Sequence, residues 1–105
     1  MSNYLNLLKD HFTMMEPQSI IDKLTQKLPG AEISVQDLTG TKDHFRVTIV
    51  AAQFEGLLMV KQHRMIYDLL RDCMEDQGGG IHALSLNTYT PTQWQEQKQQ
   101  VRKGA

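Results

Sequence analysis

Two stretches of alternating apolar and polar residues constrain the fold of this chain more than any other feature. Ile33 and Val35 alternate with polar residues in the first stretch, 31–38, and the same alternation fills the second, 45–51. A period of two is typical of strands that bury one face. Because a short polar stretch with one glycine separates them, the two strands are predicted to form a hairpin.

Helical periodicity flanks this hairpin on both sides. Residues 17–28 before it and residues 57–76 after it carry apolar side chains at helical spacing. The glycines at 78–80 are expected to end the second helix, since glycine tolerates positive φ. A third strand is expected over 81–89, followed by a short turn over 91–94. The element order is therefore α-β-β-α-β.

This order predicts the topology of the sheet. A strand, a helix and a following strand normally form a right-handed crossover in which the two strands run parallel. The chain is therefore expected to form an α/β (α+β) domain with a three-stranded mixed sheet and helices on one face. His44 and His82 stand at the starts of the two parallel strands, so the topology places them at the same edge of the sheet.

The length of the chain, 105 residues, suits one domain with a modest core. That domain is expected to span residues 16–95. Residues 1–15 are interpreted as a separable N-terminal extension. Residues 96–105 are rich in glutamine and charge, and are interpreted as a polar C-terminal tail that is either a solvated helix end or disordered.

Charge and cysteine content narrow the function classes. The net charge is -1, so no overall field attracts nucleic acid or an anionic membrane. The single cysteine, Cys73, excludes an internal disulfide and suits a reducing compartment. The longest apolar runs are too short to span a bilayer, and the first ten residues do not resemble a secretory signal. A cytoplasmic protein without a membrane partner is therefore expected.

The histidines are the strongest candidates for chemistry, because no HExxH, CxxC, phosphate-binding loop or GxSxG motif is present. No acid, base and nucleophile stand at workable spacing, so an enzyme is not expected. Cys73 is interpreted as a small hydrophobe on the inner face of the second helix. His63 is interpreted as a boundary residue of that helix with a structural hydrogen bond. His11 is assigned no role.

His82 and His44 each allow two interpretations. His82 lies on the face of Leu84 and Leu86, at the margin of the core, where the more common case is a histidine hydrogen-bonded to a carbonyl. The alternative is a metal ligand, since neutral imidazole is a good ligand and a strand start is rigid. His44 alone is most often an exposed turn residue. Together, the two form half of a metal site, whose other ligands must come from a partner.

Several motifs, in order along the chain, resemble the BolA family. They are Phe54-Glu55-Gly56, the stretch from Gln62 to Tyr67, the stretch from Ile81 to Leu86, and Tyr89-Thr90-Pro91 leading to Trp94. The hairpin residues His44-Phe45, with the preceding Gly40, also match. The resemblance covers residues 17–95 approximately, and the combination of motifs makes it specific.

This resemblance implies a fold related to class II KH domains and a partnership with monothiol glutaredoxins of the CGFS type. It further implies a 2Fe–2S cluster bridged by the glutaredoxin cysteine, a glutathione thiolate and ligands from the BolA partner. The near-invariant ligand of the family matches His82. The second ligand, in the hairpin loop, is matched by His44, although some members carry it several residues earlier, where this chain has Thr41.

Two further sets of residues are candidates for contacts with macromolecules. His63, Arg64 and Tyr67 are predicted to contact the protein partner. As an alternative function, a nucleic-acid-binding transcriptional regulator, the basic residues Lys61, Arg64 and Arg71 would contact DNA. The acidic residues among them, and the lack of a GxxG loop, favour the protein-binding interpretation.

Overall fold

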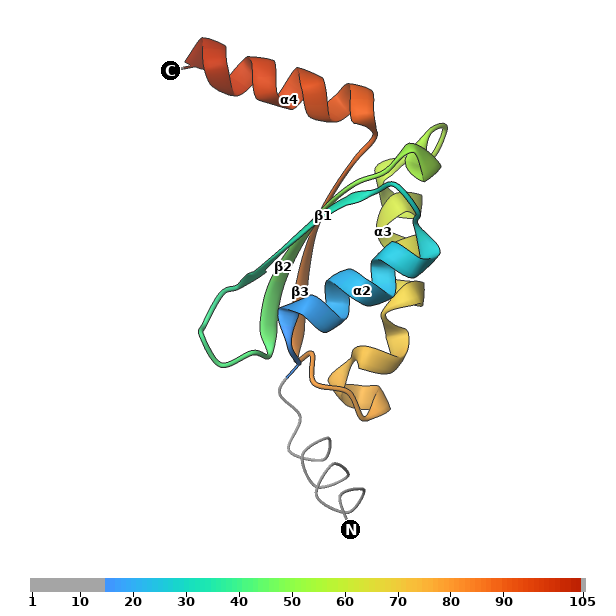
Figure 1. Ribbon diagram of the computed structural model, residues 1–105, viewed down its shortest axis with the longest axis vertical. Helices are drawn as coiled ribbons and strands as arrows, with labels where there is room; N and C mark the ends of the chain where they lie inside the picture. The colour runs from blue at the N-terminus through green and yellow to red at the C-terminus, as the bar shows by residue number, and fades with distance from the viewer. Residues whose placement is uncertain (1–14, 105) are drawn as a thin grey trace.

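The computed structural model describes residues 15–104, with side chains described through residue 100. Its centre is a three-stranded sheet in the order β1-β2-β3, formed by β1 (Glu32–Asp37), β2 (His44–Val50) and β3 (Ala83–Tyr89). β1 and β2 are antiparallel, and β2 and β3 are parallel. The mixed sheet and the α+β order predicted from the sequence are therefore confirmed (Figure 1).

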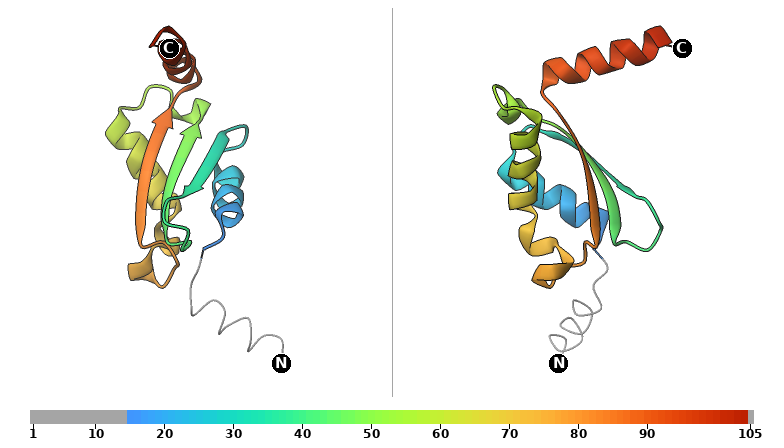
Figure 2. Two further views of the ribbon diagram at one scale, coloured as in Figure 1. Left: turned by 90° about the vertical axis from the view of Figure 1, so that its left-hand side faces the viewer. Right: turned by 180° about the vertical axis from the view of Figure 1, so that it is seen from behind.

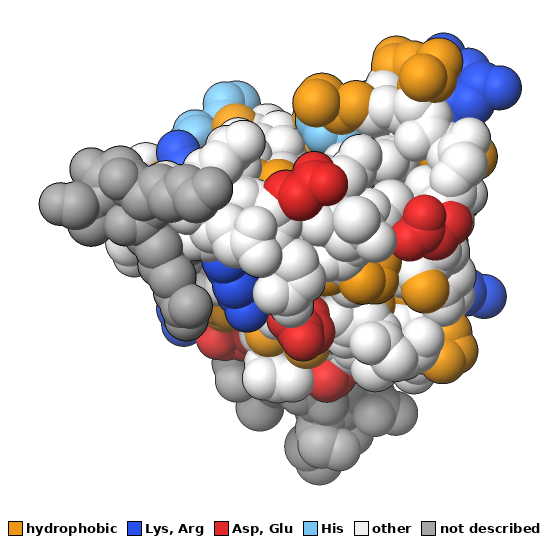
Figure 3. Space-filling model, turned by 90° about the horizontal axis from the view of Figure 1, so that it is seen from above, with side chains coloured by type: hydrophobic (Ala, Val, Ile, Leu, Met, Phe, Trp, Pro, Cys, Tyr) orange, Lys and Arg blue, Asp and Glu red, His pale blue; other side chains and the backbone are white. Residues whose placement is uncertain are grey.

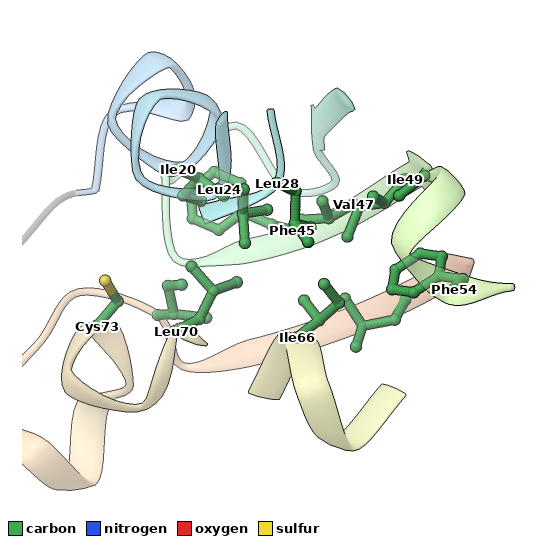
Figure 4. Packing of buried hydrophobic residues seen from close by; sticks show 13 residues of the cluster. Ile20, Leu24, Leu28, Phe45, Val47, Ile49, Phe54, Ile66, Leu70 and Cys73 are labelled. Carbon is green, nitrogen blue, oxygen red and sulfur yellow. The ribbon is translucent and has the colours of Figure 1, made fainter. Parts of the chain in front are cut away.

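Two helices, α2 (Pro17–Lys27) and α3 (Met59–Leu69), cover one face of this sheet, as the two views in Figure 2 show. The core lies between the two layers. Phe45, Val47 and Ile49 on β2 are fully buried, and they meet Leu24 of α2 and Ile66 of α3 in one cluster (Figure 4). Burial of each such side chain contributes about 1.5–3 kcal/mol relative to exposure, so the inward-facing residues of the hairpin anchor the fold.

The second helix is shorter than predicted. It ends at Leu69 rather than near Asp76, and two 3-10 turns follow, η2 (Arg71–Cys73) and η3 (Glu75–Gln77). Hydrogen bonds to Ile81 explain the early end: its N–H donates to the Cys73 carbonyl at 2.9 Å, and its carbonyl accepts from the Glu75 N–H at 2.8 Å. These pairings take up backbone groups that a longer helix would use.

The chain ends in a helix, α4 (Pro91–Gly104), where a short turn was expected. Thr90 and Gln93 explain it. The Thr90 Oγ1 accepts a hydrogen bond from the Gln93 N–H at 3.1 Å, and the Gln93 Oε1 accepts one from the Thr90 N–H at 2.9 Å. This reciprocal pair is a capping box, and Pro91 suits the first helical position after it. The helix runs without a break through the expected boundary between 95 and 96, and projects away from the sheet (Figure 1).

The N-terminal side of the domain includes Met15. This residue packs against the core, and its N–H donates to the Lys42 carbonyl at 3.1 Å. The rest of the expected N-terminal extension, with His11, lies outside the described residues.

Candidate functional site

The starts of β2 and β3 bring two histidines together. His44 pairs with Ala83 in the parallel register, and the His82 N–H donates to the Asp43 carbonyl at 2.8 Å. The centroids of the two imidazole rings are 5.0 Å apart, with the ring planes tilted by 58°. The predicted placement of both histidines at one sheet edge is therefore confirmed. Their role as metal ligands stays a prediction.

The turn before His44 is organised by two aspartates. The carboxylate of Asp37 accepts hydrogen bonds from the N–H groups of Gly40 at 3.0 Å and Lys42 at 3.1 Å. Lys42 adopts a positive φ of 59°, which a non-glycine residue holds only where its surroundings impose it. These bonds close the turn and present Asp43 and His44 at its end.

Each imidazole has a carboxylate at its Nδ1 atom. The Nδ1 of His44 lies 2.8 Å from the Oδ1 of Asp43, and the Nδ1 of His82 is hydrogen-bonded to the Oε2 of Glu75. An ionised carboxylate only accepts, so each Nδ1 carries a proton and each Nε2 of a neutral ring keeps its lone pair. A carboxylate behind a histidine is the usual support for a metal-ligating imidazole.

The electrostatics of the edge follow from these contacts. The hydrogen bond that His82 donates to Glu75 raises the pKa of His82, because it stabilises the imidazolium. Hydrogen bonds from the Thr41 hydroxyl and then from His44 hold the pKa of Asp43 below its usual value. Glu75 therefore favours a proton on His82, and a metal ion must compete with that proton for the imidazole.

His82 is more exposed than predicted. Its side chain is 58% exposed, and its hydrogen-bond partner is a carboxylate rather than a carbonyl. The alternation that placed it on the face of Leu84 begins only at Ala83, whereas Ile81, bridged to Met74, fills the core position instead. An exposed imidazole is accessible to a ligand from a second protein.

The described chain supplies only part of a metal site. Among residues 15–100, no group of three or more His, Cys, Asp or Glu side chains is arranged to hold a metal ion. Cys73 is buried, and burial raises the pKa of its thiol, so it stays protonated and is a poor ligand. The prediction that it behaves as a small hydrophobe is consistent with its place in the core. The exposed imidazole of His82 and the half-buried imidazole of His44 thus fit a centre completed from outside the described chain.

The residues predicted for macromolecular contacts lie on and beyond α3. His63 is half-buried and Arg64 is exposed. The Tyr67 hydroxyl donates to the Leu84 carbonyl at 3.0 Å, which places Tyr67 beside the start of β3. Arg71 lies past the helix in η2, where it forms an ion pair with Asp68. The three predicted basic residues are therefore not on one helix. Lys61 and Arg64 lie on α3, whereas Arg71 lies beyond α3 and is paired with Asp68.

Sequence reasoning missed the two carboxylates that orient the imidazoles. Asp43 could have been found, because it directly precedes His44 in the sequence. Glu75 could not, since it was expected in a continuous helix. The break at Leu69 and the pairing of residues 73–75 with Ile81 bring it to His82.

Comparison with known proteins identifies the family. A family model described as BolA-like protein matches residues 19–93. The chain belongs to the BolA family. BolA-like protein 1 of Homo sapiens is 42% identical over 60 residues, which are 57% of this chain and 42% of the human protein.

Two other BolA relatives bear more specific names. The DNA-binding transcriptional regulator BolA of Vibrio cholerae is 39% identical over 61 residues, 58% of this chain and 55% of that protein. The protein named BOLA1, chloroplastic, of Arabidopsis thaliana is 35% identical over 85 residues, 69% of this chain and 51% of that protein. The chain therefore spans about half the length of the curated BolA relatives that it matches. Their names are those of a regulator or of BolA proteins, and none is that of an enzyme.

Solved BolA structures share the fold. The BolA domain of SufE1 from Arabidopsis thaliana superposes with a TM-score of 0.63 at 36% identity, covering 72% of this chain and 92% of that one. BolA1 from the same plant gives a TM-score of 0.63 at 36% identity, covering 74% and 96%. No helix within the described residues has the length and apolar character needed to cross a membrane.

Proposed function

We propose that this BolA protein binds a monothiol glutaredoxin of the CGFS type and shares a bridging 2Fe–2S cluster with it. His82 and His44 are the ligands contributed by this chain. The remaining ligands are the glutaredoxin cysteine and a glutathione thiolate. In this function the protein is an adaptor in iron–sulfur trafficking or iron and redox regulation, and not an enzyme.

One observation carries the proposal: the imidazoles of His44, at the start of β2, and His82, directly before β3, have ring centroids 5.0 Å apart, and each is backed by a carboxylate at Nδ1. Nitrogen ligands held in this way suit one iron of a cluster. The accessible thiolates that a complete site needs are absent from the described chain, because Cys73 is buried. A thiol-supplying partner therefore complements the edge.

Each residue of the edge has a distinct task in this proposal. Asp43 and Glu75 fix the rings through Nδ1, so that Nε2 is the nitrogen left for the cluster. Tyr67, bonded to Leu84, fixes α3 against β3 beside His82. The cluster, when bound, supplies a one-electron redox centre whose potential rises where imidazole replaces thiolate on one iron.

Reconstitution under anaerobic conditions tests the proposal. The full chain is mixed with a CGFS glutaredoxin, glutathione, ferrous iron and sulfide, and the complex is isolated by size-exclusion chromatography. The expected result is a mixed complex whose visible absorption and circular dichroism change in His82→Ala. In His82→Cys the cluster is expected to persist with a third, distinct spectrum, because a thiolate replaces the imidazole.

His11→Ala is the matched control, because it removes an imidazole that has been assigned no role. Its complex is expected to keep the wild-type spectrum. His44→Ala and Thr41→Ala decide the second ligand, with a spectral change expected only in the first. A His82→Ala complex with an unchanged spectrum removes His82 from the site, and failure of any mixed complex to form overturns the proposal.

A relative's name supports a second candidate function. The Vibrio cholerae relative is named a DNA-binding transcriptional regulator, and Lys61 and Arg64 are exposed on α3. DNA binding by this chain would then depend on those two residues more than on Arg71, which is paired with Asp68. A salt titration with specific and scrambled duplexes tests this, since a regulator retains sequence preference at physiological salt.

The cysteine content of the chain bears on its cellular compartment. We propose the cytoplasm, because a single buried cysteine suits a reducing environment. One relative is named chloroplastic, so cell fractionation with an antibody against the native protein is the direct measurement.

A further inference from the structure

The start of α3 exposes a run of apolar residues that the fold does not require. Leu58, Met59 and Val60 are 71%, 66% and 61% exposed. Leu58 is the N-cap of α3 and makes no side-chain cap hydrogen bond, although Ser, Thr, Asp or Asn is strongly preferred there. A sequence that sets three large apolar side chains in solvent, one of them at an unsuitable cap, points to a use other than stability.

A shallow hollow lies along α3, and its residues Met65 and Leu69 follow Leu58 at the spacing of one helix face. Its volume is about 440 Å³, and its lining combines an apolar floor with charged rims: Leu57, Met65 and Leu69 with Lys61, Arg64 and Asp68. Figure 3 views this end of the molecule and shows hydrophobic side chains at the surface beside Lys and Arg side chains.

The charges beside the hollow are not balanced. The carboxylate of Asp68 is engaged by Arg71. Lys61 and Arg64 form no ion pair with any of the described side chains. The hollow therefore presents two free cations next to an apolar floor, a combination that complements a ligand with both apolar and acidic groups.

We propose that this surface, formed by Leu57, Leu58, Lys61, Arg64, Met65 and Leu69, docks an acidic amphipathic helix of a second protein. Apolar side chains at helical spacing on that helix cover Leu58 and fill the hollow. Carboxylates on its flanks pair with Lys61 and Arg64. This is the helix-in-groove mode of recognition, in which apolar side chains one turn apart on the docked helix fit into a hydrophobic groove.

The start of α3, with Leu58, lies at the end of the sheet opposite to the histidine edge, and the hollow extends from there along the helix. His44 begins β2, and α3 begins after the chain has left the far end of β2 at Val50 (Figure 1). Seven residues of β2 cover roughly 20 Å at the rise of a strand. A partner at the histidines and a helix anchored at Leu58 therefore meet opposite ends of the domain, and Arg64 is the one residue assigned to both. This inference goes beyond the proposed function and does not depend on it.

Selection from a library of random 16-residue peptides displayed on phage, with the full chain as bait and no glutaredoxin present, tests the proposal. The expected peptides combine Asp or Glu with apolar residues three and four apart. Their binding is then measured by fluorescence polarisation, and mapped by the amide shifts of residues 57–69 in NMR spectra. Enrichment of peptides without acidic residues, or of none, overturns the proposal.

Leu58→Ser is the decisive variant, because serine is a better N-cap than leucine. It is expected to keep or raise the stability of α3 while weakening peptide binding by at least roughly tenfold, as expected for loss of one buried leucine. Lys61→Glu with Arg64→Glu is expected to abolish binding of the acidic peptides and to select basic ones instead. A Leu58→Ser variant that binds as well as the wild type overturns the proposal.

Matched substitutions elsewhere control for general effects. Leu38→Ser removes an exposed leucine from the hairpin, and Lys27→Glu reverses an exposed charge on α2. Both are expected to leave peptide binding unchanged.

Two other occupants are tested in parallel. If Leu58→Ser weakens only single-stranded DNA binding, the surface serves nucleic acid. If it weakens only self-association in sedimentation, the surface binds a second copy of the chain. Either result overturns the proposal.

Discussion

The imidazole of His82 donates from Nδ1 to the carboxylate of Glu75. Glu75 lies in η3 and His82 immediately before β3, so the contact joins the two ends of the glycine-rich loop. The loop itself is closed by the N–H of Gly79, which donates to the Met74 carbonyl at 2.9 Å. The orientation of a candidate ligand thus depends on the irregular segment between α3 and β3.

The substitution Glu75→Gln is expected to lower the pKa of His82 toward its ordinary value. Glu75 raises that pKa by stabilising the imidazolium, and a neutral amide does so much less. Because the folded-state pKa is raised, the pair stabilises the fold below the ordinary histidine pKa, and this stability is lost as the pH rises through the folded-state pKa. NMR titration of the His82 ring nitrogens measures the shift.

Asp76→Asn is a suitable control for this titration, because it removes a neighbouring exposed carboxylate that forms no ion pair with His82. It is expected to leave the His82 titration curve nearly in place. If Glu75→Gln and Asp76→Asn shift the curve equally, a general field and not the hydrogen bond perturbs His82.

Gly79→Ala is expected to destabilise the fold strongly. A Cβ at residue 79 would lie 2.1 Å from the carbonyl oxygen of Cys73, so the loop must move away from η2. At Gly78 a Cβ meets open space, and only the positive φ of 85° opposes a side chain, at a cost of about 1–2 kcal/mol. Urea denaturation is expected to rank Gly79→Ala as clearly less stable than Gly78→Ala. The reverse order would contradict the close approach.

Local sequence signals were sufficient to predict the sheet. Features that depend on contacts between residues far apart in the sequence were not predicted. The alternation through Ile33, Val35, Phe45 and Val47 was sufficient for the hairpin, because the inward face of β2 is buried and that of β1 is half-buried. The parallel pairing that unites His44 with the start of β3 followed from the handedness of the crossover. The end of α3 was not predictable in this way, since it depends on hydrogen bonds to Ile81 across the loop.

The prediction of a short turn at 91–94 failed for a different reason. The helix there begins at a local signal, the capping box of Thr90 and Gln93. The polar composition of the tail obscured this signal in the sequence. The carboxylate at His82 depended on tertiary structure alone. Fold and histidine placement were thus predictable from local pattern and topology, whereas the groups that orient the candidate ligands were only partly so.

Thr90→Ala is expected to destabilise α4. Loss of the side-chain cap leaves the Gln93 N–H without its partner, at a cost of about 1 kcal/mol. Hydrogen exchange at the amides of the first turn of α4 is expected to accelerate several-fold, while amides of β2 keep their protection. Thr90→Ser, which retains a hydroxyl, is the control and is expected to behave like the wild type. Equal exchange in both variants would show that packing, and not the cap, holds the helix start.

Acid stability is expected to depend in part on the ion pair between Lys23 of α2 and Asp72 of η2. The hydrogen bond from Lys23 holds the pKa of Asp72 below its usual value. A carboxylate with a lowered folded-state pKa stabilises the fold above its unfolded pKa, and this contribution is lost as the pH falls through the folded-state value. The unfolding midpoint of Lys23→Met is therefore expected to vary less with pH than that of the wild type below about pH 4. Lys27→Met removes a lysine of the same helix that forms no ion pair within residues 15–100, and it should keep the wild-type slope. An identical slope in Lys23→Met would show that solvent screens the pair completely.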